Sequence, residues 1–291
     1  MIRSLLDNSL DQQIRALQGF DFQDFVILLL FKVHGTNGFT NLRTIRDKGC
    51  DGIIVAESCA IACYGPKADT KFAAHKKKVS EDYDKYATHW KAAHPMWRLF
   101  VNMEPTPDLL ALCNGLHGSI DVVWGVSRMV EMTKEISFGL RREVCSALRV
   151  PDEYVGRDFV GMLLDDLLTM PIGSRRLDFN RSAPDIAAKV KKNYSAERVA
   201  GAVARLELTL DQQADVYEAI GALSPEDTKI LKLRLITDFE AATGTSFDEK
   251  FDALVDTYTL RYNRSADDGA SAYIQAMLLH VFVQCFIGEE P

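Results

Sequence analysis

Two short apolar segments, residues 52–56 and 59–64, are separated only by Glu57 and Ser58. Runs of this length joined by a tight turn are typical of a β-hairpin. The residues just before them, 47–52, read Asp-Lys-Gly-Cys-Asp-Gly and predict an acidic turn that leads into the first strand. Side chains alternate along a strand, so Ala62 and Tyr64 are expected to face the same way.

The segments around this hairpin alternate between helical and strand patterns. Apolar residues recur at helical spacing before the hairpin, and compact apolar runs of strand length follow it. This alternation predicts an α/β domain with a mixed sheet over residues 1–150. Its expected helices are 9–34 (divided near Gly19), 70–93, 105–116 and 128–148, and its expected strands are 39–46, 97–103 and 120–124 with the hairpin.

Strand patterns disappear from Pro151 onward. Seven helical patterns follow one another with short polar or Gly/Pro connections, which predicts an all-α domain over residues 151–291. The expected helices are 159–170, 183–194, 195–208, 211–223, 225–243, 248–262 and 270–286.

Hydropathy and cysteine usage bear on the compartment. The longest apolar run, residues 25–31, is seven residues long, whereas a bilayer span needs roughly 20. The first residues form no sustained apolar segment, so we expect a cytoplasmic protein. The six cysteines show no zinc-type spacing and are expected to be buried, reduced thiols.

Charge is unevenly distributed along the chain. Residues 1–150 contain 19 Lys+Arg against 17 Asp+Glu, and residues 151–291 contain 15 against 24. Within residues 67–98, eight bases stand against four acids. Such a basic stripe can contact phosphates, or it can be a solvated helix face balanced by Glu81 and Asp82. The candidate phosphate contacts are Lys71, Lys76, Lys77 and Lys78.

Three phrases of the first domain resemble a known family. Gly-Phe-Asp-Phe-Gln-Asp-Phe at 19–25, the acidic turn at 47–52 and Ala-Ile-Ala-Cys-Tyr-Gly-Pro at 60–66 resemble the restriction-endonuclease-like, or PD-(D/E)xK, superfamily in the version found in bacterial antiphage systems. The resemblance covers roughly residues 15–125. The tail, residues 278–291, is similar to the helical region of components that accompany an SMC-like ATPase, as in ABC-three-component or Lamassu-type systems.

The resemblance implies a magnesium site, which this sequence matches only in part. Asp51 falls on the metal-binding aspartate, and Gln23 or Asp24 falls on the acid of the first helix. Ala62 and Tyr64 occupy the positions of the family's Glu/Gln and Lys, and neither side chain supplies that chemistry. Read without the family, Asp51 belongs to an Asp-Gly turn.

A lysine displaced from its family position could complete such a site. Lys67, three residues after Tyr64, is the first candidate, and Lys78 is the second. If the site is active, Asp51 holds Mg²⁺ and the reaction is metal-dependent phosphodiester hydrolysis, with Asp51 and Lys67 as catalytic residues.

Two functions stay open from the sequence. The first is a DNA-binding or DNA-cleaving component of an antiphage complex with a degenerate metal site, whose helical domain docks a protein partner. The second is a catalytically inactive scaffold that positions or regulates a partner. A small-molecule enzyme built on the sheet is a third, and a homodimer is compatible with each. A fold alone does not establish which of them applies.

Overall fold

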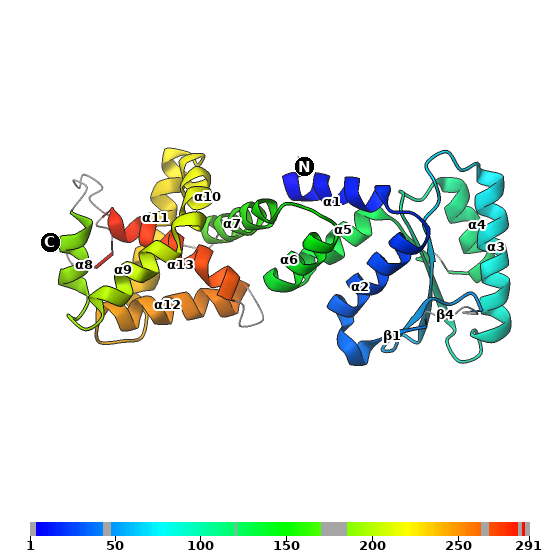
Figure 1. Cartoon of the computed structure of the whole chain (residues 1–291), viewed down its shortest axis with the longest axis horizontal. Coiled ribbons are helices and arrows are strands. Elements are labelled where there is room, and N and C mark those ends of the chain that lie inside the picture. The colour runs from blue at the N-terminus through cyan, green and yellow to red at the C-terminus, as the bar shows by residue number, and fades with distance from the viewer. Residues whose placement is uncertain are drawn as a thin grey trace. The chain divides into compact units, whose positions relative to one another are not determined.

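The computed structural model describes residues 4–42, 48–119, 121–169, 185–262, 268–284 and 287–288. It divides into two compact units. The first contains the chain up to Ile136 and Leu140–Asp152, and the second contains Ser137–Gly139 and the chain from Glu153 onward. Thirteen helices and one five-stranded mixed sheet are found among the described residues, and all five strands belong to the first unit (Figure 1).

The predicted first helix is two helices, α1 (Leu5–Ala16) and α2 (Gly19–Gly38). Ser4 begins α1 with a capping box in which its hydroxyl accepts the Asp7 N–H and the Asp7 carboxylate accepts the Ser4 N–H. Gly19, at φ +51°, turns the chain into α2, and its N–H donates to the carbonyl of Gly65 at 3.0 Å. The start of α2 is therefore tied to the end of the predicted hairpin.

The hairpin and the mixed sheet are confirmed. The strand order is β1-β2-β3-β4-β5, with antiparallel pairing from β1 to β3 and parallel pairing from β3 to β5. Ile53 pairs with Ala60 across the hairpin. The last residues of the predicted strand 39–46 lie outside the described residues. The strands are β1 (Phe39–Asn41), β2 (Gly52–Ile54), β3 (Cys59–Tyr64), β4 (Met96–Val101) and β5 (Val123–Trp124).

Helices cover both faces of this sheet. Figure 1 shows α3 (Phe72–His89) and α4 (Pro107–His117) on one face and α2 on the other. The face toward α3 and α4 carries a buried cluster in which Ala60, Ala62, Trp97 and Leu99 of the strands join Val79, Tyr83 and Tyr86 of α3. The aromatic residues of α3, which recur at helical spacing, are therefore part of the core at Tyr83 and Tyr86. Phe72, by contrast, is 38% exposed.

The expected single helix over residues 128–148 is wrong. It consists of α5 (Val126–Glu135) and α6 (Phe138–Ala147), separated at Ile136, whose backbone is extended. The last carbonyls of a helix have no partner within it. Arg141 supplies one by donating to the Lys134 carbonyl at 2.5 Å, and this contact closes the end of α5.

The regular elements of the second unit are all helices among its described residues, and each of the seven predicted helices is present, the first of them beginning at Asp152 instead of residue 159. The buried residues of α13 include Leu278 and Phe282, and α13 packs against α10 and α12. By length and hydropathy, none of the helices described in this chain qualifies as a membrane span. The helices are α7 (Asp152–Thr169), α8 (Ile186–Asn193), α9 (Val199–Leu208), α10 (Leu210–Gly221), α11 (Pro225–Ala241), α12 (Phe247–Tyr262) and α13 (Asp268–Val283).

Asn102, just after β4, joins two loops of the first unit. Its side chain is buried, and Nδ2 donates to the carbonyls of Leu17 at 2.6 Å and Pro66 at 3.1 Å. We expect Asn102→Ala to lower the free energy of unfolding by about 1–3 kcal/mol, because two carbonyls lose their donor. Urea denaturation measures this change, with Asn8→Ala at an exposed position of α1 as the control. Equal effects of the two substitutions would contradict the role given to Asn102.

Candidate functional site

Asp51 stands at the end of the acidic turn, directly before β2. The turn uses positive φ angles at Lys48 (+56°) and Gly49 (+79°). A Cβ at Gly49 would lie 2.4 Å from the carbonyl oxygen of Asp82 in α3, so only glycine allows this close approach. Asp47, the first residue of the motif, lies outside the described residues.

The carboxylate of Asp51 is buried, with 9% of the residue exposed, and it accepts hydrogen bonds on both oxygens. Oδ1 accepts from Nε2 of Gln23 in α2 at 2.9 Å, and Oδ2 accepts from the backbone N–H of Cys63 in β3 at 2.6 Å. The Cys63 thiol lies close to the same carboxylate, and burial together with this carboxylate raises the pKa of the thiol. A buried carboxylate needs hydrogen-bond donors to offset its desolvation. The carboxylate thus joins α2 to the hairpin.

Ala62 and Tyr64 lie toward the other side of the sheet. Ala62 belongs to the buried cluster beneath α3 and α4, and Tyr64 packs against that cluster. The predicted hairpin pairing is present, but the Asp51 carboxylate is directed to α2. The structure therefore does not bring Asp51 together with the side chains at positions 62 and 64.

Tyr64, at the family's lysine position, is part of a small hydrogen-bonded chain. Its hydroxyl lies 3.1 Å from Nδ1 of His75 in α3, and Nε2 of His75 lies 3.0 Å from the Thr70 carbonyl. A carbonyl only accepts, so Nε2 carries a proton and, in a neutral ring, the Tyr64 hydroxyl donates to Nδ1. Burial raises the pKa of Tyr64 above its ordinary value. The phenol therefore anchors the start of α3 and supplies no cation.

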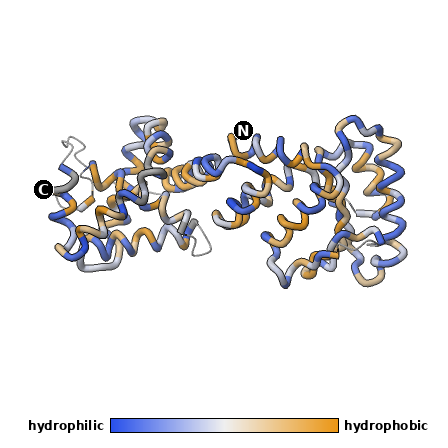
Figure 2. Tube along the Cα trace, in the orientation of Figure 1, coloured by the Kyte–Doolittle hydropathy of each residue, from blue (hydrophilic) through white to orange (hydrophobic). Residues whose placement is uncertain are grey.

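The predicted lysines are exposed side chains on or near α3. Lys67 lies in the turn after β3, where its carbonyl accepts the Thr70 N–H, and Lys71 precedes the first residue of α3. Lys78 forms an ion pair with Asp82 at 2.8 Å. Figure 2 shows α3 as a largely hydrophilic helix. The exposed lysines are Lys67, Lys71, Lys76, Lys77 and Lys78.

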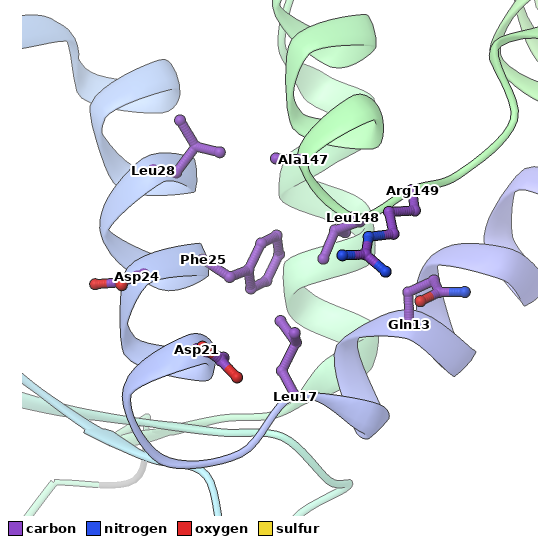
Figure 3. Close-up of a pocket in the computed structure, with 9 residues that line it drawn as sticks. All are labelled: Gln13, Leu17, Asp21, Asp24, Phe25, Leu28, Ala147, Leu148 and Arg149. Carbon is purple, nitrogen blue, oxygen red and sulfur yellow. The ribbon is translucent and has the colours of Figure 1, made fainter.

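Two further acids of the first unit, Glu57 and Asp24, do not lie with Asp51 in a shared site. Glu57, in the hairpin turn, pairs with Nη2 of the buried Arg98 at 2.9 Å, and the Arg98 guanidinium stacks over Trp124 at 3.8 Å. Asp24 lines a cavity of about 450 Å³ between α1, α2 and the end of α6. Figure 3 shows Arg149 extending over Leu148 toward Phe25 in that cavity.

The donor set does not fit the magnesium ion that the resemblance implies. Mg²⁺ prefers several oxygen ligands in octahedral geometry. Asp51 contributes one carboxylate, both of whose oxygens already accept hydrogen bonds from Gln23 and Cys63. No group of three His, Cys, Asp or Glu side chains suited to a metal occurs in the part of the chain that the structure describes.

Sequence patterns missed the roles of Gln23 and Cys63. The resemblance assigns Gln23 only the position of the helix acid, and cysteine usage predicts Cys63 only as a buried thiol. Cys50, Cys59, Cys113 and Cys145 are buried, as predicted, and none of them is in a disulfide bond, whereas the residue Cys63 as a whole is partly exposed. Cys285 lies outside the described residues. No periodic pattern links Gln23 to Asp51, because their contact spans 28 residues of sequence.

Comparison with known proteins adds no relative: no family model, no curated protein and no solved structure matches this chain.

The hydrogen bonds of Asp51 predict a stability effect. In Asp51→Asn, one oxygen becomes an NH₂ group that faces the Gln23 amide or the Cys63 N–H, both of which are donors. We expect the free energy of unfolding to fall by about 2 kcal/mol or more, because buried donors lose their acceptor. Chemical denaturation measures it, with the exposed Asp69→Asn as the matched control. A carboxylate that serves only as a metal ligand would not lower the free energy of unfolding of the metal-free protein when it is replaced. Unchanged or increased stability in Asp51→Asn would therefore contradict our assignment.

The buried thiols predict a loss of stability at alkaline pH. Burial raises the pKa of Cys59 to about 11 and that of Cys113 to about 12, from an ordinary 9.0. Burial and the Asp51 carboxylate also raise the pKa of Cys63. Above pH 9 the unfolded chain releases these protons while the folded chain keeps them. Stability should therefore decline from about pH 9 upward, by up to about 1.4 kcal/mol per pH unit per thiol.

Denaturation at pH 8, 9 and 10 measures this decline. Cys113→Ala should show a shallower decline than the native chain, whatever its stability at pH 8. A pH-independent free energy of unfolding across this range would disprove the assignment.

Proposed function

We propose that the first unit is a nuclease-like module that binds the phosphate backbone of DNA without cutting it, and that the acidic helical unit docks a protein partner. One observation supports the proposed absence of cleavage: both oxygens of the Asp51 carboxylate accept hydrogen bonds, from Gln23 and from Cys63. Support for the nuclease-like ancestry comes from the helix, the acidic turn and the hairpin that carry the family phrases.

The first turn of α3 supports phosphate binding. It contains no acid, and Lys71 at its N-cap forms no side-chain cap. The free N–H groups and the positive end of the helix dipole favour an anion there. Lys76 and Lys77 are exposed within the next turn. Lysine contacts to phosphate give affinity without a choice of base sequence.

The second unit has the opposite charge. Residues 151–291 contain 15 Lys+Arg against 24 Asp+Glu, so nucleic acid is a poor ligand for this unit. Within the proposal it is the part that docks a protein. The resemblance predicts an SMC-like ATPase complex of an antiphage system as the partner class.

The rival function is an inactive scaffold that does not bind DNA. The hydrogen bonds of Asp51 are compatible with both functions, which differ in whether α3 contacts phosphates. Lys78 already pairs with Asp82, and Lys85 also approaches Asp82 at 3.4 Å, which lowers the net charge of that face. Measuring DNA binding separates the two functions.

DNA binding should weaken steeply with salt and depend on α3. We expect Lys76→Ala/Lys77→Ala/Lys78→Ala to reduce the slope of log K against log[salt] by about one for each lysine that contacts a phosphate. Fluorescence anisotropy with a duplex of mixed sequence measures the slope. The triple variant Lys191→Ala/Lys192→Ala/Lys250→Ala removes the same charge from the second unit and should leave it unchanged. If the native chain does not bind DNA even at low salt, DNA binding is excluded and the scaffold function is favoured.

Cleavage is tested separately on plasmid and linear DNA with Mg²⁺ and Mn²⁺. We expect no cutting by the native chain or by Asp51→Ala. Metal-dependent cutting by the native chain that disappears in Asp51→Ala would overturn the non-cleaving assignment and would restore Asp51 as a metal ligand.

A further inference from the structure

The second unit contains a cavity of about 600 Å³ between α10, α11 and α13. This volume is in the range of small-molecule sites. Its apolar lining residues are Ile220, Leu223 and Pro225. The polar lining comprises Tyr217, Thr228, Lys229, Lys232, His280 and Gln284.

His280 brings a buried, unsatisfied polar atom to the cavity. Its Nε2 lies 2.9 Å from Nε2 of Gln284. In this orientation of the amide the nitrogen donates, so the His280 Nε2 accepts and the proton of the neutral ring is on Nδ1, while Oε1 of Gln284 is also buried without a partner among the described residues. Nδ1 is buried and has no hydrogen-bond partner within the described residues. A buried N–H without an acceptor is costly, and such groups in native proteins call for an explanation.

Two lysines make the same region electropositive. Lys229 is exposed and Lys232 is half-buried, and both line the cavity from one face of α11. Burial, together with the charge of Lys232, lowers the pKa of His280 to about 4. Burial also lowers the pKa of Lys232. An anion in the cavity would relieve both effects, because it would stabilise the cationic forms.

The apolar lining residues, together with the ring of Tyr217, favour a ligand that is more than a bare ion. The Tyr217 ring lies 4.8 Å from the His280 ring and is 40% exposed, which leaves an aromatic surface open to a ligand. Ile220 and Leu223 continue this surface. The polar and apolar lining residues together match a ligand with an anionic head and an apolar body.

We propose that this cavity binds a small amphipathic anion, whose head group accepts hydrogen bonds from Nδ1 of His280 and from Lys232 and whose apolar part lies against Tyr217, Ile220 and Leu223. The site goes beyond the proposed function and is independent of it. It gives the helical unit a ligand of its own, in addition to a protein surface.

Calorimetric titration of the full chain with octanoate, octyl phosphate and 1-octanol tests the site. We expect at least one of the two anions to bind and 1-octanol to bind about tenfold more weakly or not at all, because it lacks the charge. The tighter of the two anions identifies the head group. Nuclear magnetic resonance of the His280 ring should show its nitrogen signals shift on binding.

Lys232→Gln should weaken binding of the anion about tenfold, the effect of losing a hydrogen bond to a charged group. Lys191→Gln, on an exposed position of α8, is the matched control and should bind normally. Lys229→Gln provides a second variant at an exposed position if Lys232→Gln fails to fold. Equal binding of 1-octanol, unmoved His280 signals, or binding that is insensitive to the folded lysine variant would each overturn the proposal.

Discussion

The carboxylate of Asp51 connects three parts of the first unit that are distant in sequence. It accepts from Gln23 in α2 and from Cys63 in β3, while its own backbone stands at the end of the acidic turn. A buried charge is tolerated only where hydrogen bonds replace its hydration. The position of α2 on the sheet and the geometry of the turn therefore depend on this group. A backbone hydrogen bond from Gly19 to Gly65 also joins the start of α2 to the end of β3.

This arrangement gives the sheet a supporting role. Positions 62 and 64, which the resemblance equates with the family's second acid and lysine, serve the packing of α3 through the buried Ala62 and the Tyr64–His75 contact. The same packing fixes α3 against the sheet and leaves its lysines exposed. In the proposed function, the sheet positions a basic helix instead of a metal ion, and a second unit of opposite charge carries other ligands.

Local patterns predicted most of the elements and little of the site. The hairpin, the long helix α3 and the seven helices of the second unit follow from apolar periodicity and turn residues. The division between α5 and α6 was missed, because the contact that closes α5 comes from Arg141, a residue beyond the break. Arg98 was counted as part of a basic stripe, yet it is buried between Glu57 and Trp124. Exposure cannot be deduced from charge alone.

The sequence by itself determined the type and approximate position of most helices and strands, that the strands of the described residues lie in the first half, and which residue types stand at positions 51, 62 and 64. These properties depend on neighbours within a few residues. Only the tertiary structure decided that Asp51 turns toward Gln23, that Tyr64 meets His75, and that His280 and Lys232 share a cavity. Each of these follows from how separate elements pack, and a side chain's chemistry depends on the donors, charges and solvent that packing places around it.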